Sequence, residues 1–291
     1  VGGNDRKNAA SCIGNTVTLF MGTSVVLTAV LLLLVKPIVE IISTPAEAVP
    51  GTVDYLTICF IGIPFITAYN IISSIFRGMG DSKSPMFFIA VACAANIGLD
   101  YLFMGGFRMG PAGAALGTTL SQAVSVIVSL AVILKRKSGI SVRPQDLIPL
   151  SSVMGKILKI GIPVALQDGF IQISFIAITI IANRRGLNDA AAVGIVEKII
   201  SFLFLIPSSM LSTVSALGAQ NIGAGRQDRA KLTLRYAAII AACFGLCVGV
   251  LAQFFAEPAV GPFTDPSQAE GAEVMRLGGQ YLRGYVWDCL F

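Results

Sequence analysis

Seven long apolar stretches limit what this chain can fold into more than any other feature. Each has at least 19 residues, and a helix that rises 1.5 Å per residue needs about 20 of them to cross a hydrocarbon core of about 30 Å. The stretches are 17–35, 55–76, 86–105, 112–134, 160–182, 190–217 and 236–255. An eighth, from Tyr281 to Phe291, has eleven residues and is too short to span. The sequence predicts an all-α, polytopic membrane protein.

The composition supports a membrane location. Hydrophobic residues make up 55% of the chain, charged residues 13%, and the mean hydropathy is +0.79. Soluble domains carry about 25% charged residues. The formal net charge is +5, but the charges lie between the apolar stretches, so we expect the lipid bilayer, and not nucleic acid, to be the partner.

Connections rich in Lys and Arg alternate along the chain with connections that hold few of them. One set of alternate connections holds fourteen basic residues, and the other set holds five. The fourteen are Arg6, Lys7, Arg77, Lys83, Lys135, Arg136, Lys137, Arg143, Lys156, Lys159, Arg226, Arg229, Lys231 and Arg235. The five are Lys36, Arg108, Arg184, Arg185 and Arg276. Because basic loops stay in the cytoplasm, the larger set is predicted to be cytoplasmic, and the alternation agrees with seven spans.

The residues and motifs that the chain lacks argue against several classes of function. The chain has no histidine, which is the commonest metal ligand and general base. It carries neither H-E-x-x-H nor the phosphate-binding G-x-x-x-x-G-K-[ST], and its six cysteines form no C-x-x-C pair, so we expect them to pack as small apolar side chains. We therefore expect neither an enzyme nor a cofactor. Because the first residue is Val and the last stretch is short, we also expect a piece of a longer chain.

The order of features in the first part of the chain recurs in the second part. A basic segment, an apolar stretch, a nine-residue junction bounded by prolines and a Tyr-Leu pair follow one another twice. The pairs of segments are GGNDR (2–6) with GRQDR (225–229), PIVEIISTP (37–45) with PAVGPFTDP (258–266), and Tyr55-Leu56 with Tyr281-Leu282. Proline-bounded turns also recur by chance, because proline stops helices, but the matched flanks favour a duplication.

A duplication in which the first stretch matches the seventh gives a repeat of six helices. Six is even, so both copies enter the membrane from the same side, as in transporters built from parallel repeats with a pseudo-two-fold axis along the membrane normal. We therefore expect two six-helix lobes, truncated here to about seven and a half helices. Residues 1–134 would belong to the N-lobe, 135–159 would form a cytoplasmic linker, and 160–291 would belong to the C-lobe.

Four segments of the chain resemble the multidrug and toxic compound extrusion (MATE) transporters. They are RGMGDSKSPM (77–86), NIGLDYLFMGGFRMGPAGAALGTTLSQ (96–122), GIPVALQ (161–167) and GAQNIGAGRQDRAK (218–231). The resemblance covers nearly the whole chain and would make the apolar stretches the family's third to ninth helices, followed by the start of the tenth. The family's first two helices would be absent, together with an N-lobe carboxylate that is linked to ion coupling in many members.

The resemblance implies a secondary transporter in the bacterial inner membrane. It would export amphipathic organic cations in exchange for Na⁺ or H⁺, work without a cofactor, and function as a monomer. The alternative within the same superfamily is a flippase for lipid-linked precursors, for which we would expect a more basic cleft.

Acids inside the apolar stretches are the candidate site residues, because a charge at the bilayer centre costs about 2.5–3.5 kcal/mol. The duplication pairs Asp288 with Gly62, so an acid is not required there by the fold, and the resemblance implies a cation-linked Asp on the tenth helix. The alternative is an ion pair with Arg283 or a carboxylate that reaches the interface. Asp288 is our main candidate for holding the coupling ion.

Other polar residues inside the stretches are further candidates. Asp168 and Gln172 lie four residues apart on one helix face, as do Asn96 and Asp100. Each pair could line a cleft or make structural hydrogen bonds. Glu197 is the remaining candidate, although it could lie at the interface, and its neighbour Lys198 points about 100° away.

Three prolines inside the stretches are candidate hinges or tolerated bends. They are Pro64, Pro163 and Pro207, and each removes one backbone hydrogen bond from its helix.

Overall fold

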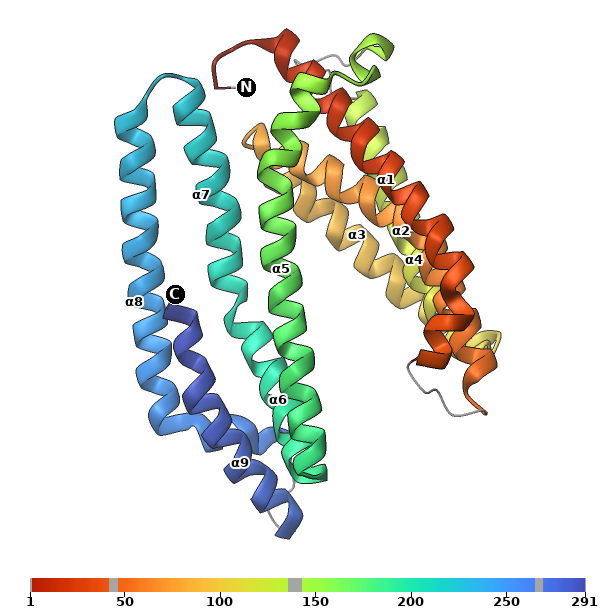
Figure 1. Ribbon diagram of the computed structural model, residues 1–291, viewed down its shortest axis with the longest axis vertical. Coiled ribbons are helices and arrows are strands. Elements are labelled where there is room, and N and C mark those ends of the chain that lie inside the picture. The colour runs from red at the N-terminus through yellow and green to blue at the C-terminus, as the bar shows by residue number, and fades with distance from the viewer. Residues whose placement is uncertain (1, 42–46, 136–142, 265–268, 291) are drawn as a thin grey trace. The chain divides into compact units, whose positions relative to one another are not determined.

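The computed structural model describes residues 2–41, 47–135, 143–264 and 269–290 (Figure 1). Every regular element in these ranges is a helix, which confirms the predicted all-α class. The contacts divide the chain into two compact units, Gly3–Leu158 and Lys159–Phe291. The assignment of 135–159 as a linker between lobes stays a prediction, and its residues 136–142 lie outside the described ranges.

The predicted spans all fall in long apolar helices. Seven such helices are found in the described residues, and they are Arg6–Ile41, Val49–Gly78, Lys83–Gly106, Gly110–Lys135, Ser151–Arg185, Leu187–Gly223 and Gln227–Phe263. Each contains one predicted stretch. The polytopic membrane fold is therefore confirmed by length and hydropathy.

The first unit contains four long helices and two short elements. They are α1 (Arg6–Ile41), α2 (Val49–Gly78), α3 (Lys83–Asp100), the π-helix η1 (Tyr101–Gly106), α4 (Gly110–Lys135) and the 3₁₀ turn η2 (Pro144–Leu147). Helix α2 packs against α1 and α4, and α3 packs against α4. The core of this unit includes Phe76 and Phe88, whose rings meet edge to face with centroids 5.5 Å apart.

Small side chains let α4 approach its neighbours closely. Its buried residues are Gly113, Ala115, Gly117, Thr119, Ser121, Ser125 and Ser129. The Ser125 hydroxyl donates to the Phe88 carbonyl of α3 at 3.2 Å, and the Thr119 hydroxyl donates to the Ile58 carbonyl of α2 at 3.3 Å. Small residues and interhelical hydrogen bonds of this kind hold membrane helices together, because lipid removes the hydrophobic driving force.

The second unit is built around α8. Its elements are the larger part of α5 (Ser151–Arg185), then α6 (Leu187–Leu203), α7 (Leu205–Gly223), α8 (Gln227–Val260), the 3₁₀ turn η3 (Gly261–Phe263), α9 (Ala269–Tyr285) and the 3₁₀ turn η4 (Val286–Leu290). Helix α8 packs against α7 and α9, and α6 packs against α9 (Figure 1). The core of this unit is formed by Val196, Ile200, Ala256, Val260 and Leu282.

Most prolines in the spans do not end their helices. Helix α1 continues past Pro37 to Ile41 and α8 continues past Pro258 to Val260, so the first proline of each junction lies inside a helix. The remainders of both junctions include residues outside the described ranges. Helices α2 and α5 are unbroken at Pro64 and Pro163. Near Pro207 the span divides into α6 and α7 at Phe204, because Pro207 cannot donate a hydrogen bond to the Leu203 carbonyl.

The cysteines only partly follow the expectation of apolar packing. Cys289 is buried and Cys59 is half-buried, whereas the other four thiols are exposed on helix surfaces. No three His, Cys, Asp or Glu side chains in the described residues come together as a metal site.

Candidate cation and substrate sites

Asp288 lines a cavity of about 460 Å³ in the second unit. One wall comes from α5 and the other from the end of α9 and η4, and the lining residues are Ile171, Ser174, Phe175, Ile178, Gly284, Tyr285, Trp287 and Asp288. The cavity therefore combines an exposed carboxylate with aromatic and aliphatic surface. This composition suits a cation that carries an apolar body.

Asp288 lies in a short turn at the end of the last helical segment. Helix α9 begins at Ala269 and ends at Tyr285, so it starts before the apolar stretch at Tyr281. Asp288 lies in the 3₁₀ turn η4 that follows. Asp288 therefore lies at the end of this helical segment. The start of α9 was hidden from the hydropathy pattern because charged residues occupy its first half.

Two tyrosines connect Asp288 with Glu197. The Tyr281 and Tyr285 rings lie 5.7 Å apart on α9, and Phe175 of α5 lies 5.9 Å from Tyr285. Both tyrosines also pack against the core cluster that contains Val196 and Ile200 of α6, the helix that carries Glu197. Half-buried Glu197 also accepts a hydrogen bond from the Thr179 hydroxyl of α5 at 3.4 Å. Helices α5, α6 and α9 thus bring two predicted site acids to one aromatic cluster.

Arg283 does not neutralise Asp288. Its guanidinium pairs with Glu257 of α8 at 3.1 Å, and its backbone carbonyl accepts a hydrogen bond from the Gln253 side chain, also at 3.1 Å. The alternative in which Arg283 pairs with Asp288 is therefore wrong in this structure. Arg283 fastens α9 to α8 instead.

The Trp287 indole is held beside Asp288 by a close approach to α8. A side chain at Gly249 would place its Cβ 2.9 Å from the indole ring. Only glycine therefore lets the indole lie this close to the helix backbone. The ring contributes to the cavity wall.

Asp168 and Gln172 lie on α5, and both are exposed. Asp168 precedes Ile171 by three residues and Phe175 by seven, so it shares their helix face one turn before the cavity begins. The predicted shared face of Asp168 and Gln172 follows from the continuous helix, but the structure assigns no hydrogen bond to this pair among the described contacts.

Asn96 and Asp100 form a second cluster, in the first unit. The Asn96 amide donates to the Asp100 carboxylate at 3.3 Å, as their shared face predicts, and both residues are half-buried. The Asp100 carboxylate lies directly against Gly117 of α4, where a Cβ would collide with it. The π-helix η1 begins at the next residue, and π-helical turns often accompany functional sites.

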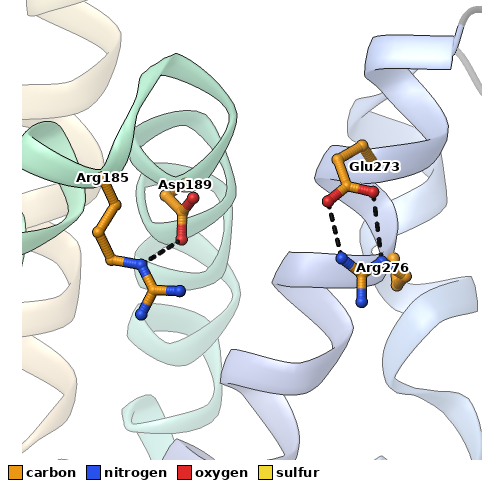
Figure 2. A network of polar contacts seen from close by, with 4 residues as sticks. All are labelled: Arg185, Asp189, Glu273 and Arg276. Atoms are coloured by element: carbon orange, nitrogen blue, oxygen red, sulfur yellow. Dashed lines mark hydrogen bonds and ion pairs between the residues drawn. The ribbon is translucent and has the colours of Figure 1, made fainter.

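A further cavity of about 350 Å³ lies toward the end of α5 that is predicted to face outward. Its polar lining includes Arg185, Asp189 and Gln280. Figure 2 shows the Arg185–Asp189 ion pair, 3.3 Å long, which joins α5 to α6 across Gly186.

The same view shows a second ion pair, on α9. Arg276 contacts Glu273 at 2.7 Å (Figure 2). The Arg276 guanidinium holds the pKa of Glu273 below its ordinary value through this hydrogen bond, and Glu273 raises the pKa of Arg276.

The acids of this site were predicted from the sequence, but four of their neighbours were not. Phe175, Thr179, Tyr281 and Tyr285 were not candidates, although Phe175 with Thr179 and Tyr281 with Tyr285 each have the four-residue spacing of one helix face. That spacing, next to acids in the same stretches, was the available signal.

Comparison with known proteins gives the same family from sequence and from structure. The MatE family model matches residues 1–102 and 163–291. The probable multidrug resistance protein YpnP of Bacillus subtilis is 36% identical over 228 residues, which cover 78% of this chain and 51% of that protein. The probable multidrug resistance protein NorM of Thermotoga maritima is 27% identical over 277 residues, covering 92% of this chain and 58% of that protein. The chain spans about half the length of these relatives.

Solved MATE structures have the same fold. A MATE transporter in complex with MaL6 matches 99% of this chain and 64% of its own, with a TM-score of 0.88 at 22% identity. An outward-facing multidrug resistance MATE transporter matches the same shares, with a TM-score of 0.84 at 24% identity. At this identity the likeness concerns the fold alone. Together with the sequence matches, it shows that the chain belongs to the MATE family, a family of membrane transporters and not of enzymes.

Proposed function

We propose that this chain serves in a multidrug exporter that moves amphipathic organic cations out of the cell in exchange for Na⁺ or H⁺. The observation that carries the proposal is the cavity of the second unit. It places the Asp288 carboxylate beside Tyr285 and Trp287, and Tyr285 packs against the core cluster that contains Val196, the residue before Glu197. A bulky cation can meet aromatic faces and a negative charge in one place there.

Exchange follows from competition for the carboxylates. A carboxylate attracts any cation that neutralises its charge, and one bound cation excludes the others from the same oxygens. Proton, Na⁺ and organic cation therefore compete for Asp288, with Glu197 and Asp168 as nearby secondary acids. If the two lobes expose the site alternately to each side, binding of the coupling ion outside releases the substrate, and binding of substrate inside releases the ion.

The named relatives support this role. YpnP and NorM are described as probable multidrug resistance proteins, and MepA of Staphylococcus aureus as a multidrug export protein. We extend their role to this chain and propose that it acts in a bacterial inner membrane as a monomer. The Asn96–Asp100 pair of the first unit is proposed as a second place where a cation binds.

A flippase for lipid-linked precursors is the alternative, and the charge of the cavity argues against it. Among the described residues, the lining of the Asp288 cavity has one acid and no Lys or Arg. Arg283 is held by Glu257. A pyrophosphate group would need basic side chains at this place, so the cavity favours a cationic substrate. Movement of a labelled lipid across the bilayer by the reconstituted protein, without export of organic cations, would support the flippase instead.

The proposal is tested by transport in proteoliposomes under an imposed Na⁺ or proton gradient. An Asp288→Asn variant keeps the size of the side chain but removes the charge, so export of a fluorescent organic cation should lose its dependence on the gradient. Asp228→Asn is the matched control, because Asp228 is exposed at the start of α8, and it should transport like the parent. Unchanged gradient dependence in Asp288→Asn would remove Asp288 from the coupling mechanism.

A further inference from the structure

Segment 143–150, which precedes α5, is fastened to α1 by a buried asparagine. The 3₁₀ turn η2 packs against α1, and Asn15 of α1 is fully buried beneath it. The Asn15 amide nitrogen donates to the Asp146 carbonyl at 3.3 Å and to the Ser11 carbonyl at 2.9 Å, while its oxygen accepts the Leu150 backbone N–H at 2.7 Å. Only this orientation of the amide satisfies all three contacts, because the oxygen faces a donor and the nitrogen faces two acceptors.

Two further residues of α1 complete the attachment. The Thr18 hydroxyl lies 2.7 Å from the Leu147 carbonyl oxygen, to which it donates. A Cβ at Gly14 would collide with the Asp146 carbonyl, so this position accepts only glycine without movement of the turn. Segment 143–150 is therefore held by Gly14, Asn15 and Thr18, and we call it the strap.

The strap is itself closed by local hydrogen bonds. The Asp146 carboxylate accepts the Arg143 backbone N–H at 2.8 Å, and the Asp146 N–H donates to the Arg143 carbonyl at 2.9 Å. A turn that is closed in this way and also anchored by a desolvated amide cannot shift along α1 without leaving buried polar groups unpaired.

The strap leads directly into α5, which crosses from one unit to the other. Helix α5 begins at Ser151 and is continuous to Arg185, whereas the first unit ends at Leu158 and the second begins at Lys159. The stem of α5 is therefore tied to α1, and the rest of the same helix carries Asp168 and one wall of the Asp288 cavity.

We propose that Asn15 is a positioning residue for transport, because it fixes the strap and makes α1 and the stem of α5 move as one body. Movement of the first unit is then transmitted through α5 to the wall of the cavity. A loose strap would absorb that movement in segment 143–150. The inference rests on the proposed function only for the need to move the two units; the attachment of the strap can be tested without it.

The attachment is tested by hydrogen exchange of the Leu150 amide in the detergent-solubilised protein. An Asn15→Leu variant removes the acceptor of this amide, so its exchange should accelerate by about tenfold or more, as loss of one buried hydrogen bond implies. Gly14→Ala is a second variant, and it should also accelerate the exchange because its Cβ displaces the turn. Gly22→Ala on the same helix is its control, because a Cβ there meets nothing within 4 Å. Unchanged exchange in both strap variants would overturn the proposal.

The effect of the strap on transport is tested by removing the Thr18 hydroxyl, which bonds the strap. Thr18→Val removes the bond to the strap, whereas the control Thr23→Val removes a hydroxyl that bonds the Leu19 carbonyl of its own helix at 2.8 Å. Because no residue of the strap is among the lining residues of the cavity, Thr18→Val and Asn15→Leu should lower kcat for organic-cation transport about fivefold and leave KM within about twofold. The control should change neither value.

Other outcomes separate this inference from the proposed function. Faster exchange at Leu150 with kcat unchanged per folded transporter would show a merely structural attachment and would overturn the positioning role. If organic cations move without any dependence on Na⁺ or protons, the proposed coupling fails, but a fall in kcat for that movement in Thr18→Val would still support the strap.

Discussion

Charged side chains of the second unit are neutralised in two different ways. Arg283 and Glu257 form an ion pair between two helices, with each side chain 37% exposed, and the Nε atom of Arg283 is buried without a partner. Arg276 and Glu273 form a pair within one helix that is more exposed. Asp288 faces a cavity instead. A partly desolvated pair that joins helices should matter more for stability than an exposed local pair.

Glu257→Gln should therefore destabilise the protein by about 1 kcal/mol, because the Arg283 charge loses its partner while its guanidinium stays partly buried. Glu273→Gln is the matched control and should leave the thermal midpoint unchanged. Thermal unfolding of the two purified variants, followed by the fluorescence of a thiol-reactive dye, provides the measurement. Equal midpoints for both variants would show that the interhelical pair adds nothing to stability.

Individual acids could be found from the sequence because a charge within an apolar stretch stands out. Asp168, Glu197 and Asp288 were visible in this way. Asn15 was not, because its amide partners Asp146 and Leu150 lie 131 and 135 positions away, and a lone amide at the cytoplasmic end of a span has no local signature. The aromatic neighbours of Glu197 come from α5 and α9, so nothing within the Glu197 stretch itself points to them.

At the scale of elements, helix α4 approaches α3 through glycine at the point where the Asn96–Asp100 pair lies. Gly117→Ala should push the Asp100 carboxylate away and cost about 1–3 kcal/mol, the usual range for overpacking. Gly98→Ala on α3 is the control, because its Cβ would meet nothing within 4 Å. If Asp100 binds a cation, Gly117→Ala should also change the Na⁺ or pH dependence of transport. Equal thermal midpoints for Gly117→Ala and Gly98→Ala would contradict the close approach of Asp100 to Gly117.

Helix positions were predictable from hydropathy, whereas their ends were not. The apolar stretches predicted the positions of the seven spans. However, α1 and α8 continue past Pro37 and Pro258, because a proline near the end of a helix removes only one backbone hydrogen bond. The division at Phe204 has no hydropathy signal. The early start of α9 at Ala269 was missed because its first turns carry the charged residues Glu270, Glu273 and Arg276, which interrupt the apolar pattern.

At the scale of the whole molecule, the charge bias of the loops predicts which side of the membrane each end faces. Cys12 lies on the first turns of α1, before its apolar stretch, and is exposed. With the other cysteines replaced, a membrane-impermeant maleimide should label Cys12 in inside-out vesicles and not in right-side-out ones. A Leu187→Cys variant, at the first residue of α6 where the side chain is 83% exposed, should show the opposite pattern. Labelling of both sites from one side would contradict the predicted topology.

The central claim is that organic cation and coupling ion compete for the carboxylate next to Trp287. Trp287 is the single tryptophan of the sequence and lines the cavity, so its fluorescence reports occupancy of this site directly. Titration with tetraphenylphosphonium should change the Trp287 emission with a saturable midpoint. Added Na⁺ or a lower pH should move that midpoint to higher concentration, and Asp288→Asn should abolish this competition. A midpoint that is the same with and without the competing ion, in parent and variant alike, would contradict the account.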